Sequence, residues 1–423
     1  MEEDVKFKKL IVRGWQQFRK VEVEVHPRLT IITGANGSGK STLLGIFAKH
    51  FDWPSSRPLA MFQKKSNRLT RILNKALNLI ERYGQNVESF GTVDYSNTAQ
   101  SEIIIRGDAG LNELQYDYEF TNDSVVVEGL FIPSHRTPYR YQALESIPAN
   151  IDQLRKNIAY RNFNESVKSR YFGENSHLKS PNYRIKEILI AWNTFGYGND
   201  KAQSYPEFVD YFVKFEEILR KMLPPTLGFQ GLSIQRSEVV LNCSTGSFYI
   251  DSSSGGVMAL IDMAWQIYMF HEDKSKSFTV VIDEVENHLH PAMQRQLLPN
   301  LLSAFPNVTF IVSTHSPLMI NSVRDSNIYA LKYVEREIET IKLDLDKSAK
   351  TSSQILDEVL GVSFTMPVWA EEVVDRLIAG IESGESTEDD FKQLRQSLSE
   401  AGLENLMPEA IEKIVEAEDD QTS

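Results

Sequence analysis

This sequence predicts an α/β fold built on a mainly parallel sheet, and three observations support that class. Residues 28–34, 278–284 and 308–315 are continuous apolar runs rich in β-branched residues, as strands buried on both faces are. Patterns typical of helices follow the first run and separate the other two. A glycine-rich turn, ITGANGSGKST from Ile32 to Thr42, joins the first strand to its helix.

The N-terminal part predicts short strands around one helix. FKKLIVRG (7–14) and VEVEV (21–25) predict two strands, the second with the alternation of an edge hairpin. Helical patterns run from Lys40 to Phe51 and again from Lys64 to Arg82, where six bases accompany one acid. Further strands are expected at SEIIIRG, ELQYDYEF and SVVVEGLFIP, all within residues 101–133.

The rest of the chain alternates helices with strands. Ile151 to Met222 is expected to be mainly helical, and residues 232–251 to form antiparallel strands. Helices are expected from Val257 to His271 and from Pro291 to Phe305, on either side of the second buried strand. Polar, helix-rich sequence follows Ser348.

Composition is that of a folded protein from a reducing compartment. The hydrophobic share is 41% and the charged share 24%, and the single cysteine, Cys243, excludes a disulfide framework. The sequence has neither a signal-peptide core nor an apolar run that could span a bilayer, so a cytoplasmic protein without a membrane partner is expected. The net charge of −13 falls almost wholly in residues 371–423, which hold 16 acidic and 4 basic residues. The main body could therefore still carry a nucleic-acid surface.

The glycine-rich turn fits the phosphate-binding pattern G-x-x-x-x-G-K-[ST]. Its glycines let consecutive backbone N–H groups turn toward phosphate oxygens, and the following helix adds its N-terminal dipole. Lys40 is expected to reach the β- and γ-phosphates of a nucleotide, and the Ser41 hydroxyl to bind Mg²⁺. The expected phosphate-binding residues are Gly34, Asn36, Gly37, Ser38, Gly39, Lys40, Ser41 and Thr42.

Two further strand ends supply the remaining chemistry. FTVVIDE ends in Asp283, which is placed to hold Mg²⁺, and Glu284, which could polarise the attacking water as a general base. Two adjacent acids after an apolar strand are costly unless a cation lies beside them. His315 follows the next buried strand, where its imidazole could hydrogen-bond the γ-phosphate. Lys40, Glu284 and His315 are thus the expected catalytic residues.

In this order, the motifs resemble those of ATP-binding-cassette (ABC) ATPases of the SMC, RecF, Rad50 and OLD-like group. FKKLIVRGWQQFRKVEVEV and GANGSGKSTLL resemble that group's N-terminal lobe, while DEVENHLHP (283–291) and STHSP (313–317) resemble its OLD-like branch. The resemblance covers residues 7–51 and 251–321, with a looser match between them. It implies a P-loop NTPase whose ABC-ATPase-like mixed sheet carries a helical insertion and a helical C-terminal extension.

The resemblance also implies a signature loop shortly before the second buried strand. DSSSGGVMALIDMAW is the candidate, with Ser254 as its serine and Gly256 as its glycine. Ser253 and Val257 depart from the family pattern, which leaves the register open by one residue. In this group two subunits enclose two ATP molecules, and each signature closes the other subunit's site. A homodimer, or a higher even-numbered oligomer, formed around ATP and Mg²⁺ is therefore implied.

At 423 residues the chain exceeds what one simple core usually holds, so two or three lobes are expected. Four regions are distinguished along the chain. They are an N-terminal ATPase lobe with Walker A (1–60), an inserted strand and mainly helical region (61–245), a C-terminal ATPase lobe (246–347) and an acidic helical extension (348–423).

Several residues keep two interpretations. The family's Q-loop glutamine could be Gln142 or Gln63, although the sequence favours a surface position for each. Trp15 could contact adenine or pack in the core. His288 and His290 fit a dimer-facing loop better than a metal site, because no further ligands lie near them in the sequence.

The resemblance implies an ATPase that hydrolyses ATP and controls a separate effector, such as a nuclease, in bacterial antiphage systems of the Septu or PARIS kind. One alternative is a RecF- or SMC-like DNA-repair ATPase, in which the basic segment 64–82 could bind nucleic acid rather than face solvent. Another is an ATP-gated sensor or scaffold without turnover. A transporter ATPase is disfavoured by the long interval between Walker A and the signature. A built-in Toprim nuclease is rejected, since Asp344 and Asp346 lack the accompanying motifs.

Overall fold

The computed structural model describes residues 4–53, 57–58, 89–106, 115–122, 125–135, 141–172, 179–198, 201, 203–271 and 276–344, with isolated residues between 372 and 407. The chain divides into two compact units, Met1–Ala349 and Lys350–Ser423. All the predicted catalytic and nucleotide-binding residues belong to the first unit. The predicted basic helix Lys64–Arg82 and the Q-loop candidate Gln63 lie outside the described residues.

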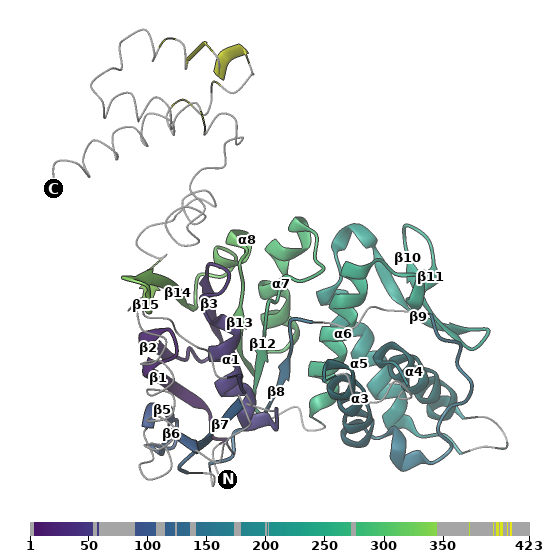
Figure 1. The fold of residues 1–423 in the computed structure, drawn as a ribbon. Coiled ribbons are helices and arrows are strands. Elements are labelled where there is room, and N and C mark those ends of the chain that lie inside the picture. Colours follow the sequence, from purple (N-terminus) through teal and green to yellow (C-terminus); the bar gives the residue numbers. More distant parts are fainter. Residues whose placement is uncertain are drawn as a thin grey trace. The chain divides into compact units, whose positions relative to one another are not determined.

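A large mixed sheet is the frame of the first unit (Figure 1). Among the described residues it has twelve strands in the order β4-β7-β6-β5-β1-β2-β15-β14-β3-β13-β12-β8. Their bounds are β1 Phe7–Trp15, β2 Phe18–Glu24, β3 Leu29–Gly34, β4 Arg57–Pro58, β5 Ser89–Tyr95, β6 Gln100–Arg106, β7 Gln115–Phe120, β8 Gly129–Ile132, β12 Phe278–Ile282, β13 Val308–Ser313, β14 Asn327–Val334 and β15 Glu337–Leu343.

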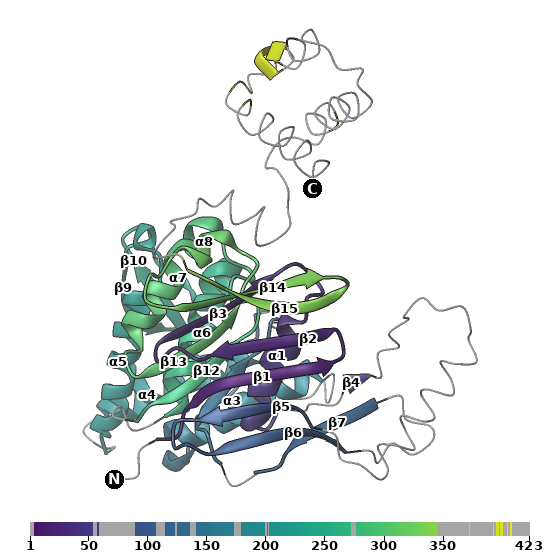
Figure 2. The ribbon, with the colours of Figure 1, turned by 90° about the vertical axis from the view of Figure 1, so that its left-hand side faces the viewer.

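The prediction of a mainly parallel sheet is correct only for the central strands. β14, β3, β13, β12 and β8 pair in parallel, and every residue of β3, β12 and β13 is buried. β1, β2, β5, β6 and β7 instead pair antiparallel, and Figure 2 shows this wing beside the central strands. Short turns join β1 to β2 and β5 to β6, and a short turn can only connect antiparallel neighbours. The sheet is therefore mixed, as the family resemblance implies.

Helices cover the sheet and form a second cluster beside it (Figure 1). Helix α1 lies against β3, β12 and β13, directly behind the P-loop. Helices α3, α4, α5 and α6 pack against one another, and α6 is buried at every position from Val257 to Met269. Because α6 is buried on every side, it is the centre of this cluster. The helices are α1 Lys40–Ala48, α3 Lys156–Tyr171, α4 Pro181–Tyr197, α5 Pro206–Met222, α6 Gly255–Phe270, α7 Pro291–Ala304 and α8 Pro317–Ile320.

The local sequence pattern predicted some of the remaining strands and missed others. A three-stranded antiparallel sheet, β9 (Phe229–Gln235), β10 (Glu238–Cys243) and β11 (Phe248–Tyr249), confirms the hairpins expected over residues 232–251. The sequence did not predict β5, β14 or β15. β15 carries exposed charges, and its place is fixed by pairing with β14 and with the distant β2. None of the described helices is long and apolar enough to cross a membrane.

Candidate functional site

The predicted motifs meet at one edge of the sheet. β3, β13 and β12 are parallel neighbours, so their carboxyl ends lie side by side. β3 ends at Gly34, β12 ends just before Asp283, and β13 ends two residues before His315. Ligands of open α/β sheets bind at this edge, outside the carboxyl ends of the strands. The fold thus brings together three segments that lie far apart in the chain.

The P-loop backbone requires glycine at two tightly packed positions. Gly34 has a φ of 142°, and a Cβ there would lie 2.6 Å from the carbonyl oxygen of Leu331. Gly39 has a φ of 87°, and a Cβ there would lie 2.5 Å from Cζ of Phe18. Both distances are shorter than real Cβ atoms show, and both backbone conformations disfavour other residues. Helix α1 begins at the next residue, Lys40, so its N-terminus faces the loop.

Lys40 is a buried cation held by neutral groups. Its side chain folds back so that Nζ donates to the carbonyl oxygens of Gly34 and Ala35, each at 2.9 Å. The residue is only 5% exposed, and this burial lowers the pKa of Lys40 to about 8, although Asp283 and Glu284 act in the opposite direction. An ammonium group in this environment would gain from an anionic ligand.

Two side chains outside the motif support the P-loop. Gln17, in the β1–β2 turn, donates from Nε2 to the carbonyl oxygen of Gly37 at 2.9 Å. The Tyr333 hydroxyl, near the end of β14, donates to the same oxygen at 3.1 Å. Sequence analysis missed both residues, because neither belongs to a local pattern and Tyr333 lies 296 positions from Gly37.

Ser313 joins the two acids that follow β12. Asp283 is 4% exposed, and its Oδ1 accepts a hydrogen bond from the Ser313 hydroxyl at 2.6 Å. The same hydroxyl oxygen accepts the backbone N–H of Glu284 at 2.7 Å. Ser313 begins the STHSP motif, but the sequence pattern predicts no role for it. In the structure it fixes both the Asp283 carboxylate and the turn that follows.

Glu284 occupies a strained turn that aims its carboxylate. Its φ of 45° lies in the left-handed region, which is uncommon for a residue with a side chain. Oε2 of Glu284 accepts a hydrogen bond from Nδ2 of Asn287 at 2.7 Å, and Nδ2 also donates to the Ser134 carbonyl oxygen at 3.0 Å. Asn287 is therefore, like Gln17 and Tyr333, a residue whose role the sequence did not reveal.

His315 lies between the acids and the P-loop. Its backbone N–H donates to Oε1 of Glu286 at 2.5 Å, while Oε2 of Glu286 is buried without a hydrogen-bond partner in the described structure. Burial lowers the pKa of His315, the charge of Lys40 lowers it further, and Glu286 and Glu284 oppose the shift. A hydrogen bond with the Gly34 backbone also opposes it, which places the imidazole against the P-loop. At neutral pH the imidazole is therefore neutral and can donate one hydrogen bond.

The signature candidates lie on a different element. Ser254 is the N-cap of α6, and its hydroxyl oxygen accepts the backbone N–H of Val257 at 3.4 Å. A Cβ on Gly256 would lie 3.1 Å from the His288 carbonyl oxygen and 3.1 Å from Sδ of Met293. The α6 N-terminus thus packs beside the loop that follows Glu284, and these contacts involve no P-loop residue.

Three residues with open interpretations have clear places in the structure. Trp15 is 4% exposed and stacks on Phe90 with ring centroids 4.3 Å apart, which favours core packing over adenine contact. His290 is the N-cap of α7, where Nδ1 accepts the backbone N–H of Ala292 at 3.3 Å. Oε1 of Gln142 accepts the hydroxyl of Ser180, just before α4, at 3.0 Å.

Comparison with known proteins gives two family matches and several relatives. A family model described as "AAA domain" matches residues 9–48, and one described as "AAA domain, putative AbiEii toxin, Type IV TA system" matches residues 261–321. The chain is 28% identical over 228 residues to a protein named Septu protein PtuA from Bacillus mycoides (strain KBAB4), covering 52% of this chain and 30% of that protein. It is 32% identical over 127 residues to "Retron Ec83 probable ATPase" from Escherichia coli, covering 28% of this chain and 23% of that protein.

The chain spans less than half the length of these relatives. Among solved structures, a Pyrococcus furiosus Smc head domain bound to the C-terminal domain of ScpA aligns with 17% identity and a TM-score of 0.43, covering 84% of this chain and 99% of that chain. The two AAA matches enclose the P-loop and the Asp283–His315 segment, which are the parts that the fold brings together. Residues 9–48 and 261–321 thus match AAA-domain models, and the chain is similar in sequence to proteins named Septu protein PtuA and Retron Ec83 probable ATPase.

Proposed function

We propose that this protein binds and hydrolyses ATP–Mg²⁺ at a site that two copies of the chain complete together. One observation carries the first part: Lys40 is a buried cation whose hydrogen bonds go to neutral carbonyl oxygens, inside a glycine cradle and beside Asp283 and Glu284. A triphosphate in the cradle would give Lys40 the anion it lacks and would accept the N–H groups at the start of α1.

The residues also fit a magnesium ion that arrives with the nucleotide. Among the described residues, no group of three or more histidine, cysteine or acidic side chains could hold a metal ion alone. Mg²⁺ is commonly held by one or two protein oxygens together with substrate phosphates. The Ser41 hydroxyl and the Asp283 carboxylate would supply those oxygens, and the bound ion would neutralise charge on the β- and γ-phosphates.

Glu284 and His315 are the residues proposed to act on the γ-phosphate. The Glu284 carboxylate, held by Asn287, would accept a proton from the attacking water. His315 is neutral at pH 7 and would donate a hydrogen bond to a γ-phosphate oxygen.

The second subunit would supply Ser254 and Gly256. In this chain they lie at the N-terminus of α6, whose free N–H groups and dipole favour a phosphate approaching from outside. We therefore propose a homodimer, or a higher even-numbered oligomer, in which each α6 N-terminus closes the partner's P-loop. ATP would hold the two copies together, and hydrolysis would release them.

The proposed setting is bacterial antiphage defence, where the ATP-bound dimer controls a separate effector protein. The names of the relatives, Septu protein PtuA and retron ATPase, support this setting. An effector such as a nuclease would be restrained or released according to whether the dimer is closed. Identifying the proteins that co-purify with the chain from its native host would test this part directly.

The test of the ATPase proposal is Glu284→Gln. We expect ATP turnover to fall by roughly 10²–10⁴-fold, the usual contribution of a general base, while ATP binding persists. Light scattering should then show an ATP-dependent dimer that the variant stabilises and that ADP does not. The matched control is Glu335→Gln, because that side chain is 85% exposed at the β14–β15 turn.

Two results would change the proposal. Wild-type turnover in Glu284→Gln would remove Glu284 as the base and overturn the assigned chemistry. If Glu284→Gln loses turnover but still controls the effector in cells, the protein is an ATP-gated sensor rather than an enzyme that works by turnover.

A further inference from the structure

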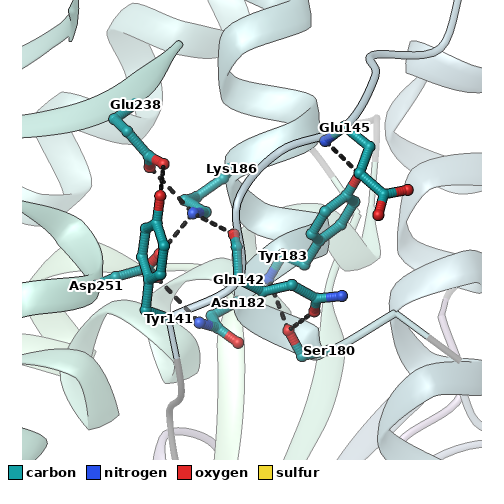
Figure 3. A network of polar contacts seen from close by, with 9 residues as sticks. All are labelled: Tyr141, Gln142, Glu145, Ser180, Asn182, Tyr183, Lys186, Glu238 and Asp251. Atoms are coloured by element: carbon teal, nitrogen blue, oxygen red, sulfur yellow. Dashed lines mark hydrogen bonds and ion pairs between the residues drawn. The ribbon is translucent and has the colours of Figure 1, made fainter. Parts of the chain in front are cut away.

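A buried charge cluster lies away from the nucleotide site, around Lys186 of α4 (Figure 3). The Lys186 side chain is 0% exposed. Its Nζ donates to Oδ2 of Asp251 at 2.5 Å, to Oε2 of Glu238 at 3.0 Å and to the Gln142 carbonyl oxygen at 2.8 Å. All three donor positions of the ammonium group are therefore used.

The two acids are also satisfied through their second oxygens. Oδ1 of Asp251 accepts from Nδ2 of Asn182 at 3.0 Å, and Oε1 of Glu238 accepts the Tyr141 hydroxyl at 3.1 Å (Figure 3). Burial alone would lower the pKa of Lys186, but the hydrogen bonds to Asp251 and Glu238 outweigh it and raise that pKa. The cluster thus stays charged and joins α4, β10, the 141–150 segment and the residues just before α6.

The location of Asp251 gives the cluster its significance. Asp251 lies in a single 3₁₀ turn, Ile250–Ser252, that leads directly into Ser254, the N-cap of α6. The intervening Ser253 contributes no side-chain hydrogen bond, because its hydroxyl is buried without a partner in the described structure. The side-chain tie that anchors this turn is therefore the Asp251 carboxylate, and Lys186 and Asn182 hold it.

We infer that Lys186 is a positioning residue for the signature turn, and that through Asp251 it sets where Ser254 and Gly256 meet the nucleotide of the facing subunit. This inference rests on the proposed function, since it assumes that the α6 N-terminus acts in the partner's site. It assigns to the helical region a defined task, which is to place the signature turn.

A buried ion cluster is weak evidence of a role in stability, because apolar residues of similar size often replace such clusters without loss. Its stronger use is to specify one arrangement of the backbone. Lys186→Met alone would leave two buried carboxylates uncompensated and could unfold the protein. The informative variant is therefore Lys186→Met combined with Glu238→Gln and Asp251→Asn, which removes the charges together and is called the neutral triple variant below.

The first measurement concerns the neutral triple variant by itself. We expect it to fold and to bind ATP with an affinity within a few-fold of wild type, because its P-loop and Asp283 are intact. Its turnover should fall at least tenfold. The control is Lys156→Met, which alters another buried lysine at the opposite end of α6, where Nζ donates to the His271 carbonyl oxygen at 2.6 Å, and which should retain turnover. Loss of ATP binding in the folded triple variant would overturn the inference.

The decisive measurement mixes subunits. Lys40→Met has an inactive P-loop but an intact signature turn. The neutral triple variant has an intact P-loop but a displaced signature turn. Each mixed dimer should contain one intact site, so an equimolar mixture should recover about a quarter of wild-type turnover if pairing is random and the sites are independent. A mixture of Lys40→Met with Ser254→Ala is the reference, because it tests the shared site without involving Lys186.

The outcomes separate the two proposals. Recovery in both mixtures supports the role of Lys186. Recovery with Ser254→Ala but not with the neutral triple variant shows that Lys186 acts within its own subunit, and overturns the inference alone. If neither mixture recovers, the shared nucleotide site is wrong, and the inference falls with it.

Discussion

Two of the buried lysines in the described part of the chain, Lys40 and Lys186, have surroundings that differ in one respect. Lys40 donates to two neutral carbonyl oxygens, and burial lowers its pKa to about 8. Lys186 donates to two carboxylates and one carbonyl oxygen, and those carboxylates raise its pKa despite burial. The charge of Lys186 is compensated by carboxylates of the protein itself. Lys40 has no carboxylate as a direct hydrogen-bond partner, so its charge is available to an anionic ligand. Burial alone therefore does not distinguish a ligand-binding lysine from a structural one, whereas the charge of its partners does.

The largest effect is expected on folding, at Lys186. Lys186→Met should lower the free energy of unfolding by about 3–5 kcal/mol, because it leaves Glu238 and Asp251 buried without their cation. Chemical denaturation measures this change, and the neutral triple variant should recover most of the loss. If Lys186→Met lowers the free energy of unfolding by less than about 1 kcal/mol, the carboxylate partners of Lys186 do not make it more important for stability than Lys40.

Lys40→Met should weaken ATP binding rather than lower the stability of the fold. ATP affinity should fall on the order of 100-fold, about 3 kcal/mol, because a desolvated cation–phosphate contact is lost. Stability without nucleotide should not fall, since no carboxylate loses a direct partner. Calorimetry gives the affinity, and Lys20→Met, whose side chain is 60% exposed on β2, is the control. Strong destabilisation of Lys40→Met would mean that Lys40 is as structural as Lys186.

The pH dependence of stability should carry opposite signs for the two lysines. The unfolded state binds the Lys40 proton more tightly than the folded state, so stability without nucleotide should rise between about pH 8 and pH 10.5. The gain is up to about 3 kcal/mol. For Lys186 the folded pKa is the higher one, so its contribution is present below pH 10.5 and is lost as pH rises through the raised pKa. The difference between the wild-type and Lys40→Met curves isolates the first effect, and a flat difference curve would refute it.

A smaller effect is expected at Ser313, which fixes the acids facing Lys40. Ser313→Ala removes one hydrogen bond to Asp283 and one from the Glu284 backbone, so the activation barrier at saturating ATP should rise by about 1–3 kcal/mol. Turnover should therefore fall roughly 5- to 160-fold. Ser204→Ala, at an exposed position before α5, should change nothing. Unchanged turnover in Ser313→Ala would show that the turn holds Glu284 in place without this hydroxyl.

The smallest effect concerns the outer support of the P-loop. Tyr333→Phe keeps the ring and removes one hydrogen bond to the Gly37 carbonyl oxygen, so ATP affinity should fall by about 1 kcal/mol, less than tenfold. Combining it with Gln17→Leu removes the second hydrogen bond to that oxygen and should enlarge the loss. If the double variant binds ATP like wild type, the loop keeps its shape through its glycines alone.

The sequence by itself determined the chemistry of the candidate nucleotide site. Gly34 to Ser41, and Asp283 with Glu284, are each encoded in a few consecutive residues after a β-branched strand, so local pattern alone identifies them. It also predicted the buried parallel strands, because a strand buried on both faces is apolar at every position. β5, β14 and β15 escaped prediction, and the exposed charges of β15 show why, because a partly exposed strand gives a weaker signal.

Only the tertiary structure decided how these groups are held. Ser313 reaches Asp283 across 30 positions, Lys186 reaches Asp251 across 65, and Tyr333 reaches Gly37 across 296. A serine, a lysine or a tyrosine has no local pattern that reveals such a partner, because the hydrogen bond forms only after sheet pairing and helix packing bring the two together. The residues of a catalytic motif are neighbours in the sequence and can be identified there. The partners that compensate a buried charge come from distant segments, which only the fold places side by side.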